Sequence, residues 1–180
     1  MFKLFGWHLV GKPPELNKYV VIIGPHTSNW DFVVFLLVKL AFKLKIVFIG
    51  KHAIFIWPFS VFLSKIGGIP VERTRAHNVV DTIVTEFSER DKMVFALSPE
   101  GTRSYLDHWK SGFYYIAKKA NVPVQCAFLD TRSKEVGWGS LFYLTDNRDV
   151  DLKKIASFYS AKKGFKPENF SKITFKHSDR

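Results

Sequence analysis

The sequence predicts a single α/β domain in which a mixed, mostly parallel sheet is covered by helices on both faces. Short apolar runs typical of buried strands alternate along the chain with longer segments that have helical apolar spacing. No repeat, low-complexity tract or linker divides the 180 residues, so we expect one domain over residues 1–180. A composition of 47% apolar and 24% charged residues is that of a globular protein.

In the first half of the chain, the expected strands are continuous apolar runs, as in strands buried on both faces. Segments 19–24 and 46–50 are such strands, and segment 31–45 between them is long enough for a helix. Segment 53–68 is apolar and ends in paired glycines, which indicates a short helix or a loop. A further short strand is expected at 68–72.

The second half continues the alternation of helices and strands. We expect helices at 77–90, 111–120 and 149–163, strands at 93–98 and 122–130, and two short later strands at 134–139 and 141–145. In sheets of this class, ligands bind in the loops outside the carboxyl ends of the strands. The chemistry is therefore expected in the loops that follow residues 24, 50, 71 and 98.

The chain is strongly basic, with 27 Lys and Arg against 16 Asp and Glu and a net charge of +11. The excess is shared by both halves, with 11 basic and 6 acidic residues in 1–90 and 16 and 10 in 91–180. An anionic partner is therefore expected: a phosphorylated small molecule, an anionic membrane surface or a nucleic acid. The 18 Phe residues favour a membrane surface, but composition alone does not separate it from nucleic acid.

Targeting, membrane-spanning and metal signals are weak. The first 18 residues lack the features of a signal peptide, and no run of 18 apolar residues is present, so we expect peripheral membrane contact at most. The single cysteine, Cys126, lies in an apolar strand, where it is expected to be an inert hydrophobic residue. The six histidines lack zinc-ligand spacing, and we expect no metal.

The first candidate site is the segment 25–31, PHTSNWD, between a buried strand and a helix. Ser28 or Asn29 is a natural helix N-cap, which places Asp31 in the first turn. A path from loop into helix lets the Asp31 carboxylate reach back to the His26 ring, fixing its tautomer and leaving the other nitrogen as a base. A plain helix cap with an incidental histidine is the alternative interpretation.

A second candidate segment is 98–104, SPEGTRS, which also follows a buried strand. Gly101 permits close backbone approach, and the Arg103 guanidinium suits a phosphate or carboxylate, unless Glu100 and Arg103 only form an ion pair across the turn. Arg73, after the strand at 68–72, is a phosphate ligand or a solvated side chain. Lys110 would add charge to a phosphate site or lie on the surface.

Taken together, four blocks resemble those of the PlsC-like 1-acylglycerol-3-phosphate (lysophospholipid) acyltransferase family. They are HTSNWD at 26–31, GGIPVERT at 67–74, SPEGTRS at 98–104 and VPV at 122–124, and the resemblance extends from about residue 19 to residue 130. It implies the glycerolphosphate acyltransferase-like fold, with His26 as general base and Asp31 orienting it. The resemblance assigns phosphate binding to Arg73, Glu100, Gly101, Thr102 and Arg103, to which Lys110 would add.

The implied reaction moves a fatty acyl group from acyl-CoA or acyl-ACP to the sn-2 hydroxyl of lysophosphatidic acid, giving phosphatidic acid. No further cofactor is expected. The expected partners are the lysophospholipid, the acyl donor or its carrier protein, and an anionic membrane, at the cytoplasmic face of a bacterial-type inner membrane. The alternatives are another acceptor, such as lyso-ornithine lipid, or a non-catalytic basic module that binds membrane or RNA. No RNA-binding signature supports the last, so no nucleic acid is expected.

Overall fold

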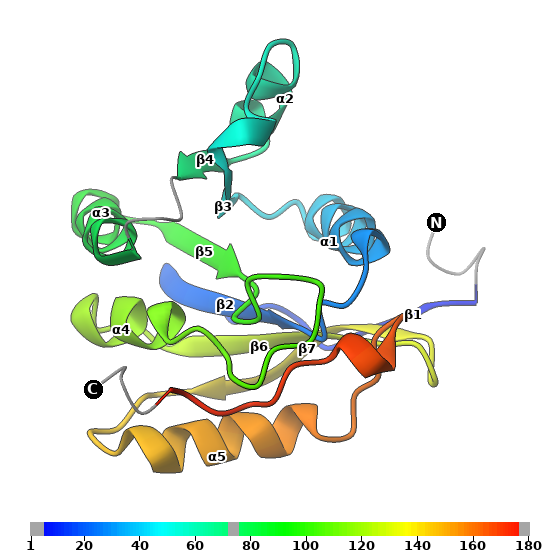
Figure 1. Cartoon of the computed structure of the whole chain (residues 1–180). Coiled ribbons are helices and arrows are strands. Elements are labelled where there is room, and N and C mark those ends of the chain that lie inside the picture. The colour runs from blue at the N-terminus through cyan, green and yellow to red at the C-terminus, as the bar shows by residue number, and fades with distance from the viewer. Residues whose placement is uncertain (1–5, 72–75, 177–180) are drawn as a thin grey trace.

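A seven-stranded sheet forms the centre of the molecule (Figure 1), in a computed structural model that describes residues 6–71 and 76–176. The strand order is β1-β7-β6-β2-β5-β3-β4, and neighbouring strands are parallel except for the antiparallel pair β6 and β7. The strands are β1 (His8–Val10), β2 (Lys18–Gly24), β3 (Ile46–Lys51), β4 (Gly68–Val71), β5 (Met93–Leu97), β6 (Val124–Asp130) and β7 (Glu135–Phe142). The predicted mixed, mostly parallel sheet is confirmed.

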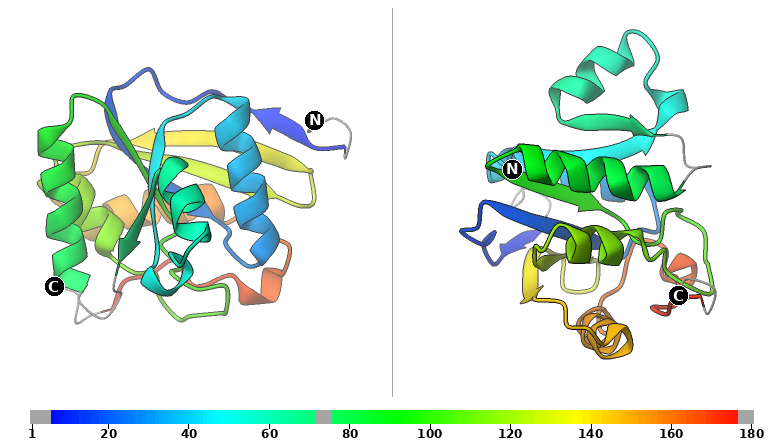
Figure 2. Two further views of the ribbon diagram at one scale, coloured as in Figure 1. Left: turned by 90° about the horizontal axis from the view of Figure 1, so that it is seen from above. Right: turned by 90° about the vertical axis from the view of Figure 1, so that its left-hand side faces the viewer.

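Helices cover both faces of this sheet, as predicted (Figures 1 and 2). The helices are α1 (Asn29–Ala41), α2 (Phe59–Lys65), α3 (Ala76–Glu89), α4 (Gly112–Lys119) and α5 (Arg148–Tyr159), with short 3-10 turns η2 (His52–Ile54) and η3 (Pro167–Asn169). One face of the central strands packs against α3, α4 and α5 in the larger core cluster, which includes Ile83, Phe113 and Ile155. The other face packs against α1 through residues such as Val21 and Val38.

The short helix α2 lies at the β3–β4 edge of the sheet. Figure 1 shows it beyond β4, on the side of the molecule opposite α5. Only Leu63 of its seven residues is buried, and its carbonyl oxygen lies close to Gly68 of β4. Over the described parts of the chain, no helix has both the length and the apolar character needed to cross a bilayer.

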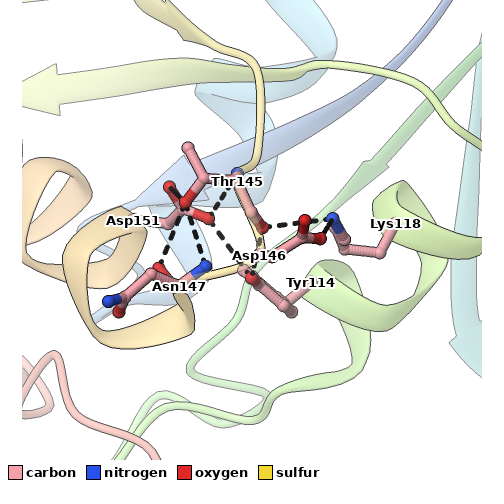
Figure 3. Close-up of polar contacts among 6 residues, drawn as sticks. All are labelled: Tyr114, Lys118, Thr145, Asp146, Asn147 and Asp151. Atoms are coloured by element: carbon pink, nitrogen blue, oxygen red, sulfur yellow. Dashed lines mark hydrogen bonds and ion pairs between the residues drawn. The ribbon is translucent and has the colours of Figure 1, made fainter.

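A polar cluster fixes the beginning of α5 (Figure 3). The Asn147 side chain caps the helix by accepting from the Val150 N–H. The buried Asp151 carboxylate accepts from the Thr145 N–H at 2.7 Å, the Thr145 hydroxyl at 2.9 Å and the Tyr114 hydroxyl at 3.2 Å. These contacts connect the β7–α5 loop to α4, so this cluster has a structural role.

The structure differs from the predicted elements mainly in β1 and β7. The strand β1, which pairs with β7, was not expected, since it is only three residues long. Two short strands were expected where β7 is continuous through Gly137 and Gly139. A Cβ at residue 139 would lie 2.0 Å from the Phe158 ring, so the glycine allows α5 to pack directly on the strand. The glycines mark this close contact and not a break.

Candidate active site

The site begins at the carboxyl end of β2, where the chain passes through a short loop into α1. Ser28 is the N-cap of α1, and its side chain and the Asp31 side chain form a capping box. The Asp31 Oδ2 atom accepts from the backbone N–H groups of Thr27 at 2.6 Å and Ser28 at 2.7 Å. The loop therefore folds back over Asp31, as predicted from the position of the cap.

This turn places the His26 ring beside the Asp31 carboxylate. The His26 Nδ1 atom lies 3.3 Å from Asp31 Oδ2, an ion-pair distance slightly longer than a good N–H···O hydrogen bond. Catalytic pairs are often this loose without substrate. The carboxylate favours the tautomer with the proton on Nδ1, which leaves Nε2 as a proton acceptor. The His26 side chain is 24% exposed, so substrate can reach the ring, whereas that of Asp31 is 3% exposed.

Asp31 lies in surroundings of low polarity. Its Oδ1 atom is buried and has no hydrogen-bond partner within the part of the chain that the structure describes. Asp31 also borders an apolar cavity of about 40 Å³ beneath α1, lined by residues such as Val34 and Trp138. A carboxylate in so little solvent interacts more strongly with a neighbouring charge than it would in water. An imidazolium formed on His26 during a reaction would lie at ion-pair distance from this carboxylate.

Glu100 lies behind the loop that carries His26, because β2 and β5 are parallel neighbours and their following loops leave the same edge of the sheet. Its side chain is fully buried, and its Oε1 atom accepts from the His26 N–H at 2.6 Å. The Oε2 atom accepts from the Ser171 N–H at 3.3 Å. Burial raises the pKa of Glu100 from 4.5 to about 7, although both backbone hydrogen bonds oppose the shift.

This position differs from the direct phosphate contact expected for Glu100. Its carboxyl group is fully buried, and both oxygens already accept from the backbone N–H groups of His26 and Ser171. Glu100 instead holds the backbone of His26 in place.

Residues 101–104 of this loop are half-buried or exposed. Gly101 has a left-handed φ of +66°, and its missing side chain leaves room for Lys110, whose Cδ would lie 2.8 Å from a Cβ there. Thr102 is half-buried, and its hydroxyl accepts from the Ser104 N–H at 3.3 Å. Arg103 is exposed and forms no hydrogen bond or ion pair with any residue in the described ranges, so no Glu100–Arg103 pair forms here. Positive charge therefore lies on this loop beside the His26 loop.

The remaining sequence predictions concern Arg73, Cys126 and metal binding. Arg73 lies outside the described residues, in the segment that follows β4. Burial raises the pKa of the Cys126 thiol to about 12, in keeping with an inert role. No group of three or more His, Cys, Asp and Glu residues that could hold a metal ion occurs in the described ranges.

A C-terminal segment that sequence reasoning missed crosses both loops of the site. The Lys166 N–H donates to the Thr27 hydroxyl at 3.1 Å, Gly164 packs on the same Thr27 side chain, and Ser171 contacts Glu100 as described above. The Ser171 hydroxyl also accepts from the Leu106 N–H at 3.1 Å. This segment has no periodic pattern that would have indicated such contacts, which join residues 65 to 139 positions apart.

A solvent-accessible histidine paired with a buried aspartate, at the strand ends of an α/β sheet, is an arrangement suited to general-base chemistry. The sequence model of the family named Acyltransferase matches residues 11–129. The chain therefore belongs to the Acyltransferase family, whose enzymes transfer acyl groups.

A solved structure with a similar fold is that of the 1-acyl-sn-glycerophosphate (LPA) acyltransferase PlsC from Thermotoga maritima. The TM-score is 0.61 at 19% sequence identity, and the match covers 87% of this chain and 70% of the other. At that identity the likeness establishes the fold. No curated protein matches the sequence.

Proposed function

We propose that the protein transfers a fatty acyl group from a thioester, acyl-CoA or acyl-ACP, to the sn-2 hydroxyl of lysophosphatidic acid. The product is phosphatidic acid. The observation that carries this proposal is the His26–Asp31 pair at 3.3 Å, which leaves Nε2 as the available base of a partly exposed ring. Family membership supplies the acyl-transfer reaction, and the basic loop beside the pair suits a phosphorylated acceptor.

In the proposed reaction, His26 Nε2 takes the proton from the acceptor hydroxyl while the oxygen attacks the thioester carbonyl. Collapse of the tetrahedral intermediate breaks the carbon–sulfur bond, and the imidazolium returns the proton to the departing thiolate. General-base assistance of this kind contributes roughly 10²–10⁴-fold to a rate. A thioester is already activated, so the step needs no nucleophile from the enzyme.

Asp31 stabilises the imidazolium as it forms, because its carboxylate already lies against Nδ1. Arg103 and Lys110, with Gly101 and Thr102, are proposed to hold the acceptor phosphate beside the base. Arg73 keeps the same proposed role. Positioning the hydroxyl in this way converts a bimolecular step into one within the complex.

The test is release of free thiol from palmitoyl-CoA in the presence and absence of lysophosphatidic acid, with wild-type protein and His26→Ala. We expect release that depends on the acceptor and disappears in the variant, with phosphatidic acid as product. Release without acceptor would show a thioesterase and contradict the proposal. Activity only with another lysolipid, such as lyso-ornithine lipid, would keep the chemistry and replace the acceptor, and acyl-ACP is tested in parallel.

A further inference from the structure

Exposed apolar side chains are concentrated on one part of the molecule. Of the 16 large hydrophobic residues exposed among the described residues, ten lie between residues 30 and 62. We call them the α1–α2 apolar surface: Trp30, Phe32, Val33, Leu40, Ile54, Ile56, Trp57, Phe59, Val61 and Phe62. Trp57 is 83% exposed and Trp30 is 66% exposed. The other six exposed hydrophobic residues are spread along the rest of the chain.

The two parts of this surface are connected. Phe32 of α1 lines a hollow of about 470 Å³ together with side chains from η2, from α2 and from the loop between them, including Phe59 and Ile56. At the other end of α1, the Lys39 ammonium group donates to the carbonyl oxygens of Ile46 and Ile66, the latter at the end of α2. The surface is thus continuous from α1 to α2, the helix beyond β4 in Figure 1.

This surface is larger than a solvated monomer usually exposes. A Phe or Trp side chain has about 150–250 Å² to bury, so the five exposed rings alone present on the order of 600 Å². Contiguous exposed patches on soluble monomers rarely exceed a few hundred Å². Furthermore, α1 is apolar on the face that packs on the sheet, at Val38, and on the opposite side, at Val33 and Leu40. A helix that is apolar all round requires a second apolar partner.

The charges around the surface identify the chemistry of that partner. Between Phe32 and Val71 the sequence has five lysines and no acidic residue. Lys43, Lys45 and Lys65 are exposed, at the end of α1 and the end of α2. A second copy of the chain, packed symmetrically here, would bring the same lysines together. Anionic lipid headgroups would neutralise these lysines, and acyl chains would receive the aromatic rings.

The surface also begins at the active site. Phe32 directly follows Asp31, whose carboxylate faces His26. We propose that the α1–α2 apolar surface docks the protein on an anionic lipid bilayer, with the His26 site facing the membrane, from which lipid acceptors enter. The orientation rests on the proposed function, whereas the binding itself does not. The 13 residues of α1 are too few to span a bilayer, which takes about 20, so the helix lies along the interface.

The test measures partition of the full chain onto phosphatidylcholine vesicles with and without about half phosphatidylglycerol. We expect binding to the anionic vesicles that decreases with salt. The double variant Trp57→Ser/Phe59→Ser should weaken this binding by about tenfold or more, because two rings no longer enter the bilayer. The matched control is Tyr143→Ser, which removes an aromatic ring that is 69% exposed in the loop after β7; binding should stay within about twofold of wild type.

Two further readouts identify the face that touches the lipid. Brominated acyl chains should quench the fluorescence of Trp57 and Trp30, while the half-buried Trp7 and the buried Trp109 and Trp138, all outside this surface, supply an unquenched background. Most of the quenching should therefore disappear in Trp30→Phe/Trp57→Phe. Lys43→Glu/Lys45→Glu should lower affinity for anionic vesicles by about fivefold or more, with an unchanged melting temperature.

Several results would overturn the proposal. Absence of vesicle binding, or equal binding by the Trp57→Ser/Phe59→Ser variant, would reject this surface. A dimer that this variant dissociates would assign the surface to a second copy of the chain. Lower turnover of a soluble short-chain acyl-CoA, with unchanged vesicle binding, would assign it to a substrate groove. Because vesicle binding is measured without substrate, binding without acyl transfer would reject only the proposed function.

Discussion

Replacement of Asp31 by asparagine should separate the electrostatic role of the carboxylate from its role in capping α1. The asparagine carbonyl oxygen can occupy the position of Oδ2 and accept from the Thr27 and Ser28 N–H groups. It can also accept from Nδ1 of His26, so the histidine tautomer is retained. The negative charge that stabilises an imidazolium is removed.

The expected loss of activity follows from the distance between His26 Nδ1 and Asp31 Oδ2. A pair of unit charges 3.3 Å apart interacts by about 5 kcal/mol at an effective dielectric constant of about 20. The amide dipole restores part of this energy, so we expect kcat/KM to decrease by about 10²–10³-fold. The new amide NH₂ group falls where Oδ1 has no partner, which should lower the free energy of unfolding by about 1–3 kcal/mol.

The assay is acceptor-dependent thiol release, with unfolding followed by circular dichroism at the assay temperature. The matched control is Asp146→Asn, which removes an exposed carboxylate paired with Lys118 and should leave kcat/KM unchanged. If folded Asp31→Asn keeps kcat/KM within about threefold of wild type while His26→Ala is inactive, the electrostatic role assigned to Asp31 is wrong.

Three other variants test the residues around the site and the polar cluster at the beginning of α5. Burial raises the pKa of Glu100 to about 7, so the stability that its protonated form contributes is complete below about pH 4.5 and is lost as the pH rises through 7. In urea unfolding, the free energy of unfolding of the wild type should therefore decrease by about 3 kcal/mol across this range, and Glu100→Gln should lack this decrease. Equal pH slopes for the two proteins would argue against this. Gly101→Ala places a Cβ at a left-handed φ against Lys110 and should cost about 1–2 kcal/mol, with a rise in acceptor KM; a variant as stable as wild type would contradict the strain. Asp151→Ala removes the shared acceptor of Thr145 and Tyr114 and should lower the free energy of unfolding by about 1–3 kcal/mol without changing KM, whereas a change in KM would indicate a functional role.

Many of the strands and helices were predictable because the sequence patterns that indicate them are local. The strands β2, β3 and β5 are apolar runs, and the α3 segment has apolar residues at helical spacing, so each was expected within a few residues of its bounds. Helix α1 begins at Asn29 after Ser28, one of the two caps expected, and ends at Ala41, four residues before the end of the predicted segment at 45. The short β1 and the continuous β7 depend on pairing between distant segments, which a single stretch of sequence does not display.

The candidate site likewise has one part that local sequence determines and another that depends on contacts with distant residues. His26 and Asp31 are five positions apart, and the geometry of one helix cap brings them together, so sequence reasoning could predict their proximity. The position of Glu100 depends on contacts with residues 74 and 71 positions away. Glu100 was expected to bind phosphate or to pair with Arg103, and only the parallel pairing of β2 with β5 places it behind the His26 loop.

The C-terminal segment that crosses the two site loops has a consequence for synthesis of the protein. The sheet, α1 and the pair formed by His26 and Asp31 all precede residue 160 in the chain, but Thr27 and Glu100 receive contacts from Lys166 and Ser171. A nascent chain that has not yet emerged to this point lacks the donor to Thr27 and one donor to Glu100. The loops that hold His26 therefore gain these contacts only after residues 166–171 have emerged from the ribosome.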